Sequence, residues 1–229
     1  PAIAAEAAAR GDEAAPETVL AGELPPLDDD QLGLMFLTCH PELPRDTAVA
    51  LTLGVVGGFG AGEIARAFLA DPRAVQQRVV RAKRLLRERH ATFGMPDGAG
   101  IAERLDAVLA VIYLMFTEGY AATAGDQPLR RDIAGEAIRL ARLVTRHPGT
   151  ATARAWALLA LLALQASRFP ARASVGGELF VLKDQDRDAW DRGLVAEGMR
   201  ALDMASTGDE VSAYHLEAGI AACHGAAPS

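Results

Sequence analysis

Apolar residues recur at helical spacing along most of the chain. The clearest case is the segment 72–90, in which Val75, Val79, Ala82 and Leu86 follow i, i+4, i+7 and i+11 spacing and so form one stripe on a helix. β-Branched and aromatic residues are sparse, and no long run alternates apolar and polar positions as a half-buried strand would. The pattern therefore predicts an all-α protein.

Four short helices are predicted within residues 28–92, and local signals mark their ends. Acids at Asp28–Asp30 precede the first helix, where they suit the positive end of the helix dipole. Asp46 or Thr47 can cap the second helix. Asp71 followed by Pro72 is a strong start signal for the fourth, with an N-cap carboxylate and a proline at the first helical position. The four helices are expected at about 31–39, 47–55, 61–69 and 72–90.

Breaks in the pattern divide the chain into four parts. Residues 1–27 are rich in alanine and acid, are interrupted by prolines and have no sustained amphipathic pattern, so we expect a linker there. Residues 28–92 form the first helical unit, and glycines and a proline make 93–100 a hinge. Residues 101–229 are predicted to form a separate multi-helix domain of hairpins, with helices at about 101–119, 129–147, 150–168, 187–206 and 210–224.

Composition limits the class of protein. Half of the residues are hydrophobic, so the chain can bury a core without cross-links. Cys39 and Cys223 are the two cysteines, with no CxxC pair, so a reducing compartment fits better than a disulfide framework. The longest apolar stretch, 155–166, is too short to span a bilayer. We expect a cytoplasmic protein without a membrane partner.

One basic segment lies in an otherwise acidic chain. The formal net charge is −7, yet residues 61–90 carry eight lysine and arginine residues against three acids. Such a segment is typical of an element that contacts phosphate, although a solvated helix face is the plainer explanation for an arbitrary basic helix. On the helix predicted at 72–90, the face opposite the apolar stripe holds Arg73, Gln76, Gln77, Arg81, Lys83, Arg84 and Arg87.

Two helices joined by a tight turn, the second lined with arginine and glutamine, are typical of a helix-turn-helix. The second helix of that motif fits the major groove of DNA, where its early side chains reach base edges and later ones meet phosphate. Arginine can form two hydrogen bonds to guanine, and glutamine can form two to adenine. The base-edge candidates are Arg73, Gln76, Gln77 and Arg81, and the phosphate candidates are Arg78, Lys83, Arg84 and Arg87.

These residues lie in runs that resemble a known family. The runs 63–69 (EIARAFL) and 74–86 (AVQQRVVRAKRLL) closely resemble region 4 of bacterial extracytoplasmic-function (ECF) sigma factors, in which this segment recognises the −35 promoter element. Runs earlier and later in the chain resemble the first helices of the same region and the long helical C-terminal extension of one ECF subgroup. They are 29–32 (DDQL), 38–43 (TCHPEL), 48–53 (AVALTL), 109–120 (LAVIYLMFTEGY), 136–142 (EAIRLAR) and 184–191 (DQDRDAWD).

The resemblance implies a fold, a set of partners and a function that this sequence performs only in part. The fold is a sigma region 4 domain, a winged-helix-like unit of three or four helices, followed by the multi-helix C-terminal domain. The implied partners are promoter DNA and core RNA polymerase, whose β flap docks against region 4. Region 2, which opens DNA and reads the −10 element, and a tetratricopeptide-like tail are missing from this sequence. We therefore expect a fragment that does not start transcription alone.

Two roles remain open for residues 101–229. The resemblance implies that this part regulates the sigma factor within the same chain. Its net negative charge suggests that it packs against the basic helix and restrains it. A passive scaffold is the equal alternative.

Two other classes of function also remain open. A ligand-sensing helix-turn-helix repressor joins the same parts, but it would contain a small-molecule pocket and bind palindromic DNA as a dimer. A protein-interaction module would bind polymerase and show only weak DNA contact alone.

Several local patterns are weak signals for other chemistry. The run 58–60 (GFG) begins a dinucleotide-binding fingerprint, but Glu63 occupies the third glycine position. Asp184, Asp186 and Asp188 imitate the start of a calcium loop without its glycine and final glutamate. The pairs 39–40 and 223–224 (both CH) lack zinc-site spacing.

The aromatic side chains and the absence of catalytic patterns in the sequence also bear on function. Core filling is the expected role of Tyr113, Phe116, Tyr120, Trp156 and Trp190, with a ligand pocket as the less favoured alternative. No Ser-His-Asp, paired-carboxylate or P-loop pattern is present. We therefore expect no enzyme, no cofactor and no metal.

Overall fold

The computed structural model describes residues 30–91, 96, 98–120, 130–174 and 178–226, so the linker expected at 1–27 lies outside it. Within these ranges the chain is helical and has no strand, apart from an isolated antiparallel bridge between Ala173 and Leu179. The predicted all-α fold is confirmed. The elements are α1 (Asp30–Thr38), α2 (Arg45–Val55), α3 (Ala61–Ala67), α4 (Pro72–Glu88), α5 (Gly98–Tyr120), α6 (Arg131–Arg146), α7 (Ala153–Ala166), α8 (Phe169–Arg172), α9 (Arg192–Ala205) and α10 (Ala213–Ala226), with 3-10 turns η1 (Leu182–Asp184) and η2 (Arg187–Ala189).

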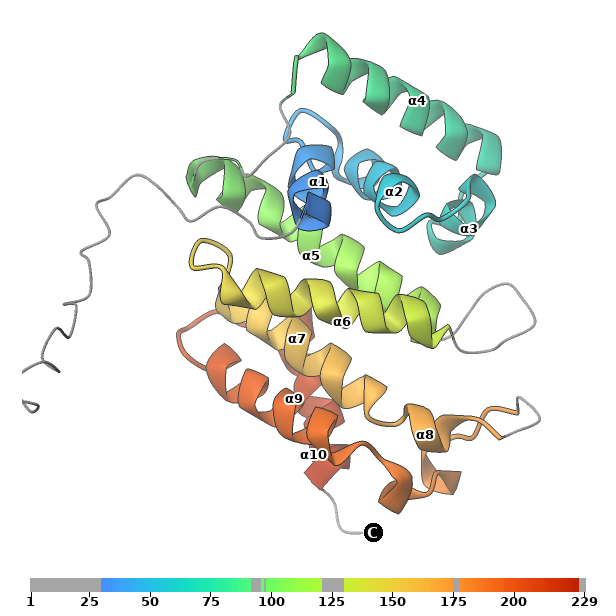
Figure 1. Cartoon of the computed structure of the whole chain (residues 1–229), viewed down its shortest axis with the longest axis vertical. Coiled ribbons are helices and arrows are strands. Elements are labelled where there is room, and N and C mark those ends of the chain that lie inside the picture. Colours follow the sequence, from blue (N-terminus) through green and yellow to red (C-terminus); the bar gives the residue numbers. More distant parts are fainter. Residues whose placement is uncertain (1–29, 92–95, 97, 121–129, 175–177, 227–229) are drawn as a thin grey trace, which may run out of the picture.

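The helices stack in layers from one end of the molecule to the other (Figure 1). α4 lies at one end and packs mainly against α2 and α3. α5 crosses beneath α1 and α2 and pairs with α6, and α7 packs against α6, α9 and α10. This order places α4 at the opposite end from α9 and α10.

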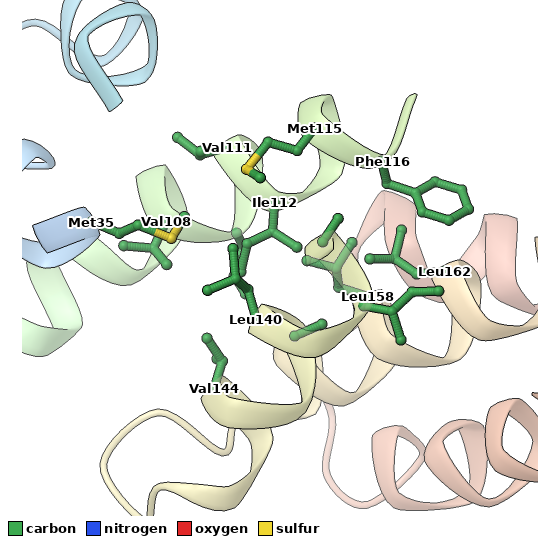
Figure 2. Close-up of a cluster of buried hydrophobic side chains, with 14 of the residues drawn as sticks. Met35, Val108, Val111, Ile112, Met115, Phe116, Leu140, Val144, Leu158 and Leu162 are labelled. Atoms are coloured by element: carbon green, nitrogen blue, oxygen red, sulfur yellow. The ribbon is translucent and has the colours of Figure 1, made fainter. Parts of the chain in front are cut away.

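The core is continuous across the boundary that was expected at residues 93–100. Met35 of α1 lies beside Val108 of α5, and Ile112 of α5 faces Leu140 of α6 (Figure 2). All four side chains are buried in one cluster. The first helical unit and the C-terminal helices therefore share a single hydrophobic core, with α5 common to both.

α7 is the central helix of the C-terminal part. Its sequence, ARAWALLALLALQA, is apolar on nearly every side, as expected for a helix surrounded by others. Ten of its fourteen residues are buried. Among the described residues, no helix is both long enough and apolar enough to cross a membrane.

The N-cap expected for α2 is wrong. The helix begins at Arg45, and the carbonyl of Pro44 accepts hydrogen bonds from the backbone N–H groups of Thr47 and Ala48. Proline has a fixed φ, so Pro44 can hold the extended backbone that precedes the helix without a side-chain cap. Asp46 therefore lies in the first turn rather than before it.

Other helix starts also differ from the expected positions, and those of α5, α7 and α10 do so by three residues. α9 begins at Arg192 rather than near 187, because the carboxylate of Asp191 accepts the backbone N–H of Leu194 and caps the helix. Asp184 and Asp188 lie in the 3-10 turns η1 and η2, and Asp186 caps η2. α5 begins at Gly98, so the last three residues of the expected hinge form its first turn.

Candidate nucleic-acid interface

Glycines form the turn that leads from α2 to α3. Gly58 has a φ of +69°, a left-handed conformation that glycine adopts without strain. At Gly57 a Cβ atom would lie 2.8 Å from the carbonyl oxygen of Leu53 and 2.6 Å from the ring of Phe59. Phe59 itself is buried in the core. The glycine-rich stretch is thus required for the chain to turn tightly over this ring.

Side-chain caps then define the starts of α3 and α4. The carboxylate of Glu63 accepts the backbone N–H of Gly60 at 2.7 Å. The carboxylate of Asp71 accepts the backbone N–H groups of Arg73 and Ala74, at 2.9 and 3.1 Å, and Pro72 is the first residue of α4. The start of α4 that the sequence predicted is confirmed.

The predicted apolar stripe of α4 faces the rest of the helix-turn-helix. Val75 and Ala82 are each 1% exposed, and Val79 and Leu86 are partly buried beside them. Ala82 packs in a cluster with Leu43, Ala48 and Leu51 from α2 and the loop before it. Burial of this stripe fixes the rotation of α4 about its axis.

That rotation turns the polar residues of α4 to the outside. The seven residues predicted for the polar face are all exposed: Arg73, Gln76, Gln77, Arg81, Lys83, Arg84 and Arg87. Two of the arginines make contacts along the helix itself. Arg81 donates a hydrogen bond to the carbonyl of Gln77 at 3.3 Å, and Arg84 pairs with Glu88 at 2.6 Å.

Arg78 differs from the other predicted contact residues because it is half-buried. It lines a groove between α4 and the start of α2, together with Leu43, Pro44 and Thr47. Its side chain therefore lies at the flank of the outward face. This position suits the edge of a contact surface better than its centre.

The outward face of α4 is not covered by the C-terminal helices. α4 packs mainly against α2 and α3, and Figure 1 shows α6 to α10 on the far side of α5. The C-terminal part does touch the first helical unit, mainly through α1 and α2, which pack against α5. The basic face of α4 is exposed among the described residues, and regulation by the C-terminal part, by masking or as a scaffold, stays a prediction.

Polar contacts add to this junction. The guanidinium of Arg139 in α6 donates to the side-chain oxygen of Gln31 in α1 at 2.9 Å. Arg104 in α5 donates to the carbonyl of Phe36 at 3.1 Å, and Arg130 lies 3.7 Å from the carboxylate of Glu63. Together with the shared core, these contacts hold the helix-turn-helix in one orientation relative to α5 and α6.

Val80 is a residue of the outward face that the sequence analysis missed. It is 66% exposed, and with Gln76, Gln77 and Arg81 it lines a shallow groove of about 490 Å³ on α4. The spacing could have identified it, because position 80 falls outside the i, i+4, i+7 stripe that starts at Val75.

The aromatic residues pack within the protein. Tyr113 packs against Tyr214 in a tilted arrangement with ring centroids 5.5 Å apart, and its hydroxyl lies 3.2 Å from the carboxylate of Glu217. Phe116 contacts Tyr120. Trp190 is buried, with the guanidinium groups of Arg168 and Arg187 over its ring. Trp156 is half-buried on α7 and packs against the core.

Cys39 and the aspartate run show no sign of metal chemistry. Burial raises the pKa of the Cys39 thiol to about 11, which keeps it protonated and a poor ligand or nucleophile. Asp186 accepts the backbone N–H of Asp188 and so caps η2. No group of three or more His, Cys, Asp or Glu residues in the described ranges is arranged to hold a metal ion.

Comparison with known proteins gives two family matches. Residues 33–86 match sigma-70 region 4, and residues 104–206 match a family of unknown function, DUF6596. The chain is also 41% identical over 197 residues, or 86% of its length, to an uncharacterized protein of Rhizobium meliloti (strain 1021). The match covers 46% of that protein, so the chain spans about half the length of this relative. No solved structure matches.

Proposed function

We propose that the chain is the promoter-recognition part of an ECF sigma factor. The proposal starts from the match of residues 33–86 to sigma-70 region 4, which supports membership of the sigma-70 family. In this proposal α4 binds the −35 element in the major groove, and region 4 docks on the β flap of core RNA polymerase. The observation that carries the proposal is the uncovered basic face of α4, positioned by an N-cap and a buried stripe.

The position of each residue along α4 suggests whether it contacts bases or phosphates. The first turns of a recognition helix approach base edges, whereas its end and flanks approach the backbone. Gln76 and Gln77 are therefore assigned to bases, with Arg73 and Arg81 beside them. Lys83, Arg84 and Arg87 are assigned to phosphates, with Arg78 at the flank. Arg84 would exchange the carboxylate of Glu88 for a phosphate on binding.

The salt dependence of DNA binding tests this assignment. Replacing Arg81 and Arg84 together with alanine removes two exposed cations from α4 without touching the buried stripe. Each lost phosphate contact reduces the magnitude of the slope of log affinity against log salt by about 0.9. Because Arg84 is the phosphate contact of the two, we expect weaker binding and a slope reduced by about one. The matched control replaces Arg146 and Arg200, two exposed arginines on α6 and α9, and should leave both quantities unchanged. Unchanged binding by the α4 variant would contradict the assignment.

Binding to core RNA polymerase tests the second half of the proposal. We expect the chain to co-purify with core polymerase and to compete with a full-length ECF sigma factor for it. Promoter-specific transcription is expected only from a longer protein that also contains region 2. Failure to bind core polymerase, combined with dimeric binding to palindromic DNA, would instead favour a ligand-sensing repressor.

For α5 to α10 we propose a positioning role. The continuous core and the contact between Arg139 and Gln31 support a scaffold that orients region 4, and the exposed face of α4 argues against masking by these helices. In this role the C-terminal part regulates the sigma factor by setting where region 4 lies relative to the rest of the protein. It leaves α4 free for DNA.

A further inference from the structure

Val80 lies where a recognition helix would meet base edges. It belongs to the third turn of α4, and its neighbours in the shallow groove are Gln76, Gln77 and Arg81. A single exposed valine is ordinary on a protein surface and would argue nothing alone. Among the described residues that line this groove, Val80 is the apolar one, and it lies beside Gln76, Gln77 and Arg81, which are polar and suited to bases.

The groove places hydrogen-bonding amide groups next to an apolar side chain. Residues three or four apart on a helix are neighbours about 5–6 Å apart, so Val80 lies next to both glutamines. No hydrogen bond from either glutamine side chain is seen within the part of the chain that the structure describes, so both amides are available to a ligand. The methyl groups of Val80 offer an apolar contact beside them.

An amide group beside an apolar side chain matches the A·T base pair as seen from the major groove. Adenine presents N7 and an amino group, which a glutamine amide can bind with two hydrogen bonds, and thymine presents its C5 methyl group, which takes apolar contacts. A guanine or cytosine in place of the thymine offers no methyl group for the valine. The groove is thus suited to DNA that contains A·T pairs.

We infer that Val80 is a specificity-determining residue, and that the groove formed with Gln76, Gln77 and Arg81 reads an A·T-containing step through contact between Val80 and a thymine methyl group. This inference rests on the proposed function and adds the class of base that the helix selects. The basic residues around the groove favour DNA over an apolar protein segment as its occupant, because Arg73 and Arg84 on the same face are also exposed.

Uracil substitution provides a direct test, because uracil is thymine without the methyl group. Duplexes with a randomised window of about two helical turns are first selected for binding to the 229-residue chain. Each thymine of the selected sequence is then replaced by deoxyuridine, one at a time. We expect one replacement, or two adjacent ones, to weaken binding about fourfold, the effect of losing one buried methyl group.

A double-mutant cycle then connects that thymine to Val80. Val80→Ala should weaken binding to the selected duplex by a similar factor, and it should abolish the further effect of uracil at the sensitive position. Alanine is a better helix former than valine, so the variant keeps α4 intact. Val211→Ala, which changes another highly exposed valine outside α4, should retain the full uracil effect.

The possible outcomes separate this inference from the proposed function. If the losses from Val80→Ala and uracil are additive, or if no uracil replacement weakens binding, Val80 does not read a thymine methyl and the inference is overturned. If the chain binds DNA with a steep salt dependence but selects no sequence, the inference is also overturned while DNA contact by α4 stands. If no duplex is bound even at low salt, both the inference and the proposed DNA contact are wrong.

Discussion

Arg142 in α6 lies opposite Glu197 in α9, and its Nε and Nη2 atoms donate hydrogen bonds of 2.7 Å to the two carboxylate oxygens of Glu197. Such a two-bond pair is more directional than a single ionic contact. The hydrogen bonds from Arg142 hold the pKa of Glu197 below its ordinary value, and they outweigh partial burial, which acts in the opposite direction. The charges of Arg142, Arg200 and Arg146 lower this pKa further.

The stability of the fold should therefore depend on the ionisation of Glu197. Because its folded-state pKa is lowered, the pair stabilises the fold above the ordinary Glu pKa of about 4.3, and this contribution is lost as the pH falls through the folded-state pKa. Glu197→Gln should cost about 1 kcal/mol of unfolding free energy at neutral pH. The difference should shrink in urea titrations at progressively lower pH. Glu103→Gln, an exposed carboxylate on α5, is the control, and a cost that does not change with pH would contradict the prediction.

The cap of α4 should affect stability and DNA binding together. Asp71→Ala removes two hydrogen bonds at the start of α4 and should cost about 1 kcal/mol. It should also weaken DNA binding, because the first turn that carries Arg73 will fray. Asp191→Ala removes the matching cap of α9 and should have a similar cost, measured by thermal unfolding, with unchanged DNA affinity. Equal DNA affinity for both variants would mean that the first turn of α4 takes no part in binding.

Replacing two helix glycines with alanine should change the free energy of unfolding in opposite directions. A Cβ atom at Gly198 in α9 would lie 2.6 Å from Leu164 Cγ in α7, so Gly198→Ala should separate the two helices and cost about 1–3 kcal/mol. At Gly135 in α6 an added Cβ meets nothing within 4 Å. Gly135→Ala should stabilise the protein by about 0.5–1 kcal/mol through helix propensity. Denaturant unfolding of both variants checks the pair, and a stabilising Gly198→Ala would show that α7 and α9 pack less closely.

Removing the contact between Arg139 and Gln31 tests whether the C-terminal helices position region 4 or cover the DNA-binding face of α4. Arg139→Ala should lower the unfolding free energy by about 1 kcal/mol and raise hydrogen exchange in α1. DNA affinity should stay the same, because the outward face of α4 is already exposed. Arg142→Ala, on the same helix but directed to α9, should leave exchange in α1 unchanged. Tighter DNA binding by Arg139→Ala alone would instead support autoinhibition.

The start of α4 and the composition of its outward face were predictable because their causes are local. Asp71 and Pro72 act on the first turn that follows them. The spacing of Val75, Val79 and Ala82 decides which side is buried and therefore which side carries the arginines. Val80 was missed although the same spacing places it outside the stripe. The α2 cap was missed because Pro44 replaces a side-chain cap with its own backbone.

The sequence by itself thus determined that these segments are helices, where α4 begins, and which face of α4 carries the candidate contact residues. Capping acts within one turn, and the spacing of apolar residues marks the face that is buried. Only the tertiary structure decided that Met35 and Ile112 share one core, that Arg139 reaches Gln31 from 108 residues away, and that the acidic helices leave α4 uncovered. The opposite charges of the acidic helices and α4 favoured contact between them. Packing of α1 and α2 against α5 instead places α4 on the side away from those helices. An apolar stripe shows which face of a helix is buried but not which distant segment covers it, so the sequence could not show these contacts.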